Sequence, residues 1–178
     1  NKIGALAISE QCLKLGSPDV LTIRLDVMDG ADIQEAVEKI TGRFKKISTI
    51  INNAGVLVYK PFTEQTDEEI EAQLRTNLEG LIKFTKAFLP FIEDFVINIG
   101  SEWGKYTVAN SAVYCATKFG VRGFSQALAK ELPNLKIFSV NPDVTATKMS
   151  HFKGRYPDDV AQVVVDLISG KFDILSGG

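Results

Sequence analysis

The sequence of 178 residues is poor in the residues that build metal sites and disulfide frameworks. It has one histidine, His151, and two cysteines, Cys12 and Cys115, which lie far apart without a CxxC spacing. A multi-histidine metal site or a histidine-based triad would depend on His151 alone, so we expect neither, and we expect no metal. The cysteines fall in helical patterns, and we interpret them as packing residues of a protein in a reducing, cytoplasmic compartment.

Long apolar runs and blocks of like charge are also missing. The longest apolar stretches have the length of a strand and are broken by charges, so no transmembrane helix and no membrane partner are predicted. The net charge is −2 with both signs interspersed, which gives no indication of a nucleic-acid partner. What is present is a 45% share of hydrophobic residues, enough for one core. We therefore expect a single domain over residues 1–178.

Strand-like and helical patterns alternate along the chain. Branched and apolar residues predict strands at 20–26, 47–51, 95–99, 136–140 and 172–175. A period near 3.6 predicts helices at 31–44, 67–90, 111–132 and from Pro157 onward. The side chains expected to face inward in the second of these helices are Ile70, Leu74, Leu78, Leu81, Thr85 and Phe88. The alternation predicts an α/β fold, a three-layer, doubly wound parallel sheet of the Rossmann-like type.

Polar residues follow the predicted strands where such sheets bind ligands, at the carboxyl ends. Asn52 and Asn53 follow one strand, Ser101 the next, and Asn141 another. Position and chemistry therefore agree on a site at this edge of the sheet.

Tyr114 and Lys118 are four residues apart in a predicted helix and therefore share one face. A free tyrosine titrates near pH ~10, and a fixed cation nearby favours the phenolate and lowers the pKa. The pair is a candidate acid/base for moving a proton to or from an alcohol oxygen. Ser101 can donate to the same oxygen, and Asn77 can orient a water that links Lys118 to solvent. Taken singly, each residue also has an ordinary structural explanation, so the assignment depends on their order and spacing.

These residues together resemble a known family. Asp26-Val27, Asn52-Asn53-Ala54-Gly55, Asn77, Ser101, Tyr114-x-x-x-Lys118 and Asn141-Pro142 occur in the order of the short-chain dehydrogenase/reductase superfamily. The resemblance extends from about residue 20 to the end of the chain. It implies an NAD- or NADP-dependent oxidoreductase that interconverts a small alcohol and a carbonyl by hydride transfer, as a homodimer or homotetramer.

The resemblance also implies a role for each matching residue. Tyr114 would be the acid/base, Lys118 would lower its pKa and bind the nicotinamide ribose, and Asn77 would support the proton relay. Ser101 would hold the substrate. Apart from the resemblance, Trp103 and Tyr106 follow Ser101 and are candidates for an apolar wall of the substrate pocket, and a partly buried surface turn explains them equally well. The residues expected to contact the cofactor are Asp26, Val27, Asn53, Ala54, Gly55, Tyr114, Lys118, Pro142, Thr145 and Thr147.

Two departures from the family pattern change what is expected. Asp143 follows Pro142 where the family usually has glycine, which adds charge beside the nicotinamide pocket. The strand, glycine-rich turn, helix and strand with which the family opens are not visible, so we expect the sequence to be incomplete at its start. The 20–26 strand would then lack its neighbour, and the choice between NAD and NADP stays open.

Two alternatives remain. One is a dinucleotide-binding sensor or scaffold of the same fold that has lost catalysis, which Asp143 and the missing glycine loop favour. The other is a dehydratase or epimerase of the same broad fold. Those relatives generally carry a larger C-terminal substrate domain, which makes this alternative the weaker of the two.

Overall fold

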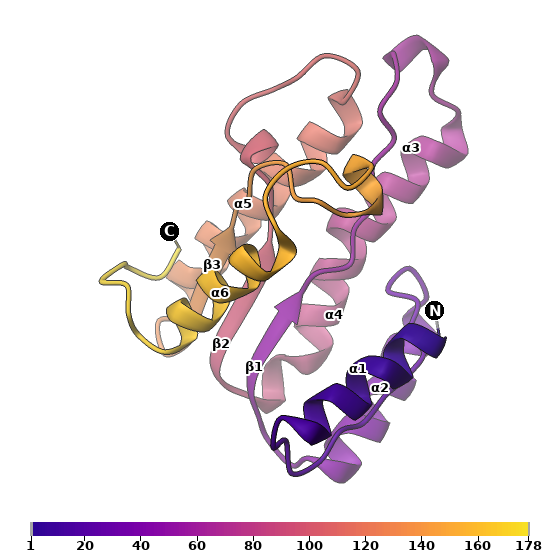
Figure 1. Cartoon of the computed structure of the whole chain (residues 1–178). Coiled ribbons are helices and arrows are strands. Elements are labelled where there is room, and N and C mark those ends of the chain that lie inside the picture. Colours follow the sequence, from indigo (N-terminus) through magenta and orange to yellow (C-terminus); the bar gives the residue numbers. More distant parts are fainter. Residues whose placement is uncertain (1, 178) are drawn as a thin grey trace.

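Three parallel strands form the centre of the molecule in the computed structural model, which describes residues 2–177 and the side chains of residues 5–177. The sheet order is β1-β2-β3, and the strands are β1 (Ile47–Asn52), β2 (Ile92–Ile99) and β3 (Lys136–Val140). Six α-helices surround it (Figure 1): α1 (Lys2–Lys14), α2 (Gly30–Arg43), α3 (Asp67–Leu74), α4 (Leu81–Phe88), α5 (Ala112–Glu131) and α6 (Pro157–Ile168). The predicted α/β fold with a parallel sheet is confirmed.

Both faces of the sheet carry helices, which gives the three layers expected from the sequence. On one face, Val96 of β2 and Ile137 of β3 pack with Ala36 of α2, Phe88 of α4 and Ala129 of α5. The other face is covered at β2 and β3 by α6, which appears in front of the sheet in Figure 1. There the buried side chains are Phe95, Ile97, Phe138, Val164 and Leu167.

Local signals fix where the helices begin. Thr66 and Glu69 form a capping box in which each side chain accepts a hydrogen bond from the other's backbone N–H, so α3 begins at Asp67 as predicted. Pro157 occupies the first turn of α6, where its missing N–H costs nothing. None of the helices within residues 2–177 combines the length and the hydropathy that crossing a membrane requires.

The predicted 67–90 helix is interrupted by a π-helical turn at Arg75–Gly80, and the predicted inner stripe is wrong at Leu74. Leu74 is 42% exposed, whereas Gln73 and Asn77 are almost completely buried. The π turn adds a residue to the helix and shifts its phase. The two amides can replace leucine on the inner face because their polar atoms have backbone partners there.

The strands predicted at 20–26 and 172–175 are not formed. Residues 20–26 have no regular secondary structure, and within residues 2–177 no strand pairs with them. Near the C-terminus, residues 172–175 are largely exposed, and the chain reaches β3 only after them. There Gly177 N–H donates to the Ile137 carbonyl at 2.7 Å and the Ser176 hydroxyl accepts from Ile137 N–H at 2.8 Å.

Candidate active site

The three strands end at one edge of the sheet, and a buried polar network fixes this edge. Asn52, the last residue of β1, donates to Asn98 of β2 at 2.8 Å and to Thr85 of α4 at 2.9 Å. Asn98 in turn donates to the Ser125 hydroxyl of α5 at 2.9 Å. Because every polar side chain of this network is partnered in a dry interior, it ties two strands to the helices behind them.

Helix α5 places Tyr114 and Lys118 on its buried face, where they are 7% and 5% exposed. The Lys118 ammonium lies 5.5 Å from the centroid of the Tyr114 ring and donates to the Ile99 carbonyl at 2.9 Å. The predicted juxtaposition of phenol and ammonium is present. The turn after β2 packs on this part of the helix at Gly104, where a Cβ would lie 2.7 Å from the Lys118 carbonyl oxygen.

Ser101 follows β2 and lies beside Tyr114. Its hydroxyl accepts a hydrogen bond from Trp103 N–H at 3.2 Å, and the Ser101 side chain acts to lower the pKa of the Tyr114 phenol. Trp103 meets the Tyr114 ring edge-on with 5.8 Å between ring centroids, a favourable aromatic geometry. Ser101, Trp103 and Tyr114 therefore form one contiguous cluster.

The pKa values differ in direction from the sequence-based expectation. Burial raises the pKa of Tyr114, and it outweighs the opposing effect of Ser101. Burial also lowers the pKa of Lys118 to about 8. The expectation that Lys118 lowers the Tyr114 pKa assumed an ammonium in a polar setting, and here both groups are desolvated.

Asn77 and Gln73 hold the loop that follows β1. The Asn77 side chain accepts from Val56 N–H and donates to the Val56 carbonyl, both at 2.8 Å, and it also donates to the Thr117 hydroxyl at 3.2 Å. One turn earlier, the Gln73 side chain accepts from Val58 N–H at 3.2 Å. Gln73 was not singled out from the sequence; its position four residues before Asn77 is the only signal, since it places both amides on one helical face.

Apart from Tyr114 and Lys118 of α5, the residues expected to contact the cofactor come from three loops. Asn53 and Ala54 are exposed after β1. A Cβ on Gly55 would lie 3.5 Å from Asn77 Oδ1 and 3.9 Å from Lys118 Nζ, so the first loop passes directly over the buried ammonium. Although residues 20–26 form no strand, Val27 packs closely on Gly80, where a Cβ would be 2.7 Å from the Val27 carbonyl oxygen.

The Asp26 carboxylate stabilises the turn that follows it in the sequence, where it accepts a hydrogen bond from Met28 N–H at 2.9 Å.

The third loop follows β3. The Pro142 carbonyl accepts from Glu102 N–H at 2.9 Å, which joins this loop to the turn that carries Ser101. Thr145 and Thr147 follow in the same loop and are half-buried.

This constellation fits a nicotinamide dinucleotide at the residues that would face it. An ammonium has three donors, and within residues 5–177 the Ile99 carbonyl is the one hydrogen-bond acceptor that Lys118 Nζ has. A buried cation with unused donors beside a glycine suits ribose hydroxyl oxygens, which are acceptors. Lys118, Gly55 and Asn77 would then lie beside the ribose and nicotinamide.

Two exposed tyrosines lie close to Trp103 of this cluster. Tyr106 is 49% exposed, and the neighbouring Glu102 carboxylate raises the pKa of its phenol. Tyr59, which the sequence did not single out, lies 6.1 Å from Trp103 between ring centroids. Trp103 thus stands between an exposed tyrosine and the buried Tyr114.

Comparison with known proteins decides the family, because a model described as short chain dehydrogenase matches residues 2–156. The chain belongs to the short-chain dehydrogenase family. It is 34% identical over 136 residues to an uncharacterized oxidoreductase of Schizosaccharomyces pombe, covering 73% of this chain and 58% of that protein. It is 34% identical over 151 residues to an NADP-dependent 3-hydroxy acid dehydrogenase of Salmonella typhi, covering 80% of this chain and 61% of that protein. The chain thus spans about three-fifths of the length of these relatives.

Two solved structures of similar proteins confirm the fold. An Escherichia coli oxidoreductase superimposes with a TM-score of 0.90 at 20% identity, covering 99% of this chain and 79% of that one. An alcohol dehydrogenase from Thermococcus sibiricus, in complex with 5-hydroxy-NADP, gives a TM-score of 0.86 at 23% identity, with coverages of 92% and 74%.

Proposed function

We propose that the protein to which this chain belongs is an NADP- or NAD-dependent oxidoreductase that interconverts a small alcohol and its carbonyl, with Tyr114 as the acid/base. The observation that carries the proposal is the convergence of Ser101, Tyr114 and Lys118 at the carboxyl edge of β2. The phenol, the serine hydroxyl and an under-used buried ammonium lie together there. Relatives named as oxidoreductases and an NADP-dependent dehydrogenase support the same reaction class.

In the reduction direction, the bound nicotinamide would supply a hydride to the carbonyl carbon. Tyr114 would donate its phenolic proton to the carbonyl oxygen, so that the C=O bond becomes H–C–O–H and the tyrosine is left as phenolate. Ser101 would donate a hydrogen bond to the same oxygen and stabilise its developing charge. The raised pKa of Tyr114 keeps the phenol protonated at neutral pH, which is the form that reduction requires.

Lys118 would return a proton to the Tyr114 phenolate and take one from solvent in its place, and Asn77 would support this relay. With a pKa of about 8, the Lys118 ammonium can release a proton near neutral pH more readily than an exposed lysine. Asn77 carries this role through the hydrogen bonds that hold the loop after β1 over the ammonium. Among the other residues assigned from the resemblance, Asp26, Val27, Asn53, Ala54, Pro142, Thr145 and Thr147 complete the proposed cofactor contacts.

The proposal is tested with Tyr114→Phe in the full-length protein. Oxidation of NADPH and of NADH is followed by absorbance with a panel of aldehydes and ketones, and the variant should lose roughly 10²- to 10⁴-fold in kcat. Trp103 is the single tryptophan of the chain and lies 5.8 Å from Tyr114, so its fluorescence reports cofactor binding without turnover. Unchanged binding with lost turnover supports the role. Retained turnover in Tyr114→Phe contradicts it, and binding without turnover by the wild type across the panel favours the sensor alternative.

We also propose that the protein is a homodimer or homotetramer that uses the outer face of α5. A shallow apolar depression lies there, lined by Val108, Ala109, Ala112, Ala116 and Phe119. Phe119 is 41% exposed. Sedimentation of Phe119→Glu, compared with the wild type, should show a smaller species if this face mediates assembly.

A cytoplasmic location belongs to the same proposal. Both cysteines are free thiols, which is compatible with a reducing compartment. Cys115 is buried and its sulfur lies 3.3 Å from the Ser111 hydroxyl, which is consistent with a packing role.

A further inference from the structure

The charge that distinguishes Asp143 from the family pattern has a partner in this chain. Arg155 donates from Nε to Asp143 Oδ1 at 2.9 Å and from its terminal nitrogen to Oδ2 at 3.0 Å. Such a two-point pair fixes direction as well as distance, which a lysine could not do. The negative charge of Asp143 is therefore neutralised by Arg155 of the same chain. The sensor alternative loses the support that an unpaired Asp143 would give it.

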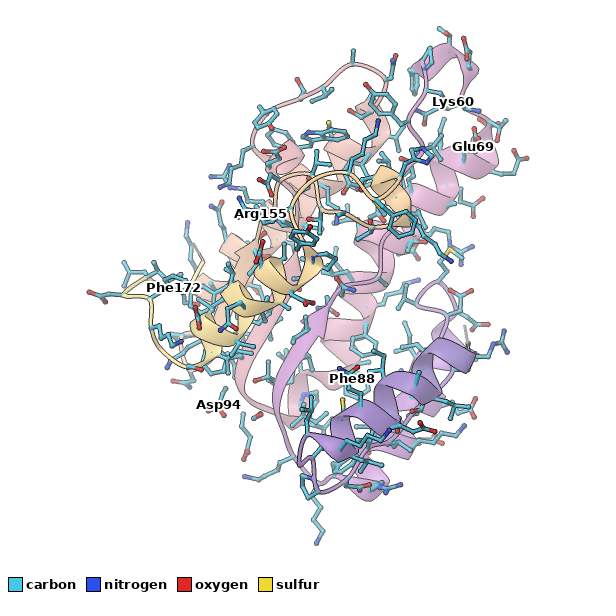
Figure 2. The ribbon with its side chains drawn as sticks, in the orientation of Figure 1. Lys60, Glu69, Phe88, Asp94, Arg155 and Phe172 are labelled. Carbon is cyan, nitrogen blue, oxygen red and sulfur yellow. The ribbon has the colours of Figure 1, made fainter. Side chains whose placement is uncertain are left out.

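The same pair closes a loop. Residues 143–155 follow β3, and Arg155, which Figure 2 labels, returns to the start of this segment, where it bridges to Thr145. Beside the ion pair, Arg155 N–H donates to the Val144 carbonyl and Ala146 N–H donates to the Arg155 carbonyl, each at 2.8 Å. The two ends of the loop are thus joined through both backbone and side chains.

The interior of the loop is bent so tightly that it needs this closure. His151, Phe152 and Gly154 have φ of 53°, 59° and 109°, in the left-handed region. For a bulky residue such as Phe152, this conformation costs free energy and persists only when the surroundings impose it. At Gly154 a Cβ would lie 2.0 Å from the Val144 carbonyl oxygen, so no other residue fits there.

We propose that the Asp143–Arg155 pair is a latch that holds residues 143–155 in a preformed shape and thereby positions Thr145 and Thr147 for their proposed cofactor contacts. The inference rests on the proposed function only for what the two threonines contact. The Thr145 hydroxyl donates to the Asp143 carbonyl at 3.0 Å, and the Ser150 hydroxyl, which accepts from Thr147 N–H at 3.1 Å, donates to the Thr145 carbonyl at 2.6 Å. Asp143 and Arg155 are positioning residues in this scheme, because they act through the threonines.

The latch contributes little to global stability. Its two side chains are 43% and 52% exposed, and exposed pairs add little to the free energy of unfolding. Loss of the pair should therefore change the loop and the binding step while the protein stays folded. This separation makes the proposal testable.

The experiment uses Asp143→Asn, Arg155→Gln and the double variant of the full-length protein. Limited trypsin digestion after Lys148 and Lys153 measures loop opening without any activity, and the KM for NADPH measures positioning. Each single variant should raise both the cleavage rate and the KM by about fivefold, the size of effect expected from losing one weak ion pair. The kcat and the melting temperature should stay nearly unchanged. The double variant should be no worse than either single one, because the pair is lost only once.

Lys171→Gln is the matched control. It removes another surface pair, Lys171–Asp166 at 2.7 Å at the end of α6, whose side chains are 62% and 24% exposed, and it should leave cleavage within the 143–155 loop and the KM unchanged. Wild-type cleavage rates in both single latch variants, or effects that multiply in the double variant, overturn the latch. If the wild type oxidises no cofactor, the proposed function fails while the digestion still decides the latch.

Discussion

The Lys118 ammonium lies 5.5 Å from the centroid of the Tyr114 ring, and its hydrogen bond goes to the Ile99 carbonyl of β2. Because β2 supplies the carbonyl and α5 supplies both side chains, the sheet and the helix jointly determine the acid/base geometry. The chemistry of the site is therefore sensitive to the pH and to any change in the network behind this edge.

Burial of Lys118 predicts a pH-dependent stability. Its pKa falls from 10.5 to about 8 on folding, so between these values the unfolded chain binds more protons than the folded one. The free energy of unfolding should then rise as the pH rises above about 8. Above about pH 10, the ordinary pKa of tyrosine, the raised pKa of Tyr114 has the opposite effect, because the unfolded chain then loses the Tyr114 proton before the folded one does. Urea denaturation at pH 7.5 and at pH 9.5 measures this effect. Between these pH values, the free energy of unfolding of the wild type should increase by about 1 to 2 kcal/mol more than that of Lys118→Met, which lacks the amine. An equal pH response in both proteins would contradict the assigned burial cost.

Asn98→Ala should destabilise the protein strongly. The substitution removes the acceptor of Asn52 and the donor to Ser125 in a network that is almost completely buried. The free energy of unfolding should fall by about 2 to 3 kcal/mol. Asn134→Ala provides the control, since Asn134 is exposed and the change should stay within about 0.5 kcal/mol. Chemical denaturation measures both, and equal free energies of unfolding would show that the network is not stabilising.

Two glycine substitutions should act in opposite directions. Gly123 lies in α5 with nothing within 4 Å of the position of a Cβ among the described residues, so Gly123→Ala should stabilise the protein by about 0.5 to 1 kcal/mol. Gly154→Ala meets the Val144 carbonyl and should disorder the 143–155 loop instead. Melting temperature and trypsin sensitivity of the loop distinguish the two effects. A stabilised Gly154→Ala would mean that the loop is not bent as described.

Asn77→Leu should impair function more than Gln73→Leu. Asn77 supplies both hydrogen bonds to Val56, next to Gly55 that passes over Lys118, whereas Gln73 supplies one hydrogen bond to Val58 farther along the loop. We expect at least a tenfold larger fall in kcat/KM for Asn77→Leu, about 1.4 kcal/mol of transition-state stabilisation. Similar losses of kcat/KM in the two variants would indicate that both amides act only as structural supports.

The sequence predicts much of this structure where the signals are local. The paired strands β1 to β3, the start of α3 and the placement of Tyr114 and Lys118 on α5 all follow from periodicity and capping. Residues 20–26 have the composition of a strand, but a strand also needs a hydrogen-bonding neighbour, which no local pattern can guarantee.

Other features depend on contacts distant in the sequence. The burial of Gln73 requires the π turn and the loop after β1, and the pairing of Asp143 with Arg155 requires the loop to return. The direction of the Tyr114 pKa depends on how completely α5 is covered, which a four-residue spacing does not reveal.

The π turn at Arg75–Gly80 makes this region intolerant of length variation. Deleting one residue would allow α3 and α4 to merge into a regular helix, and each residue lost rotates the preceding turns by about 100°. Gln73 would then leave the inner face, and the loop after β1 would lose its support. Substitutions at exposed positions of this helix are expected to be neutral, whereas insertions and deletions of a single residue are expected to be selected against.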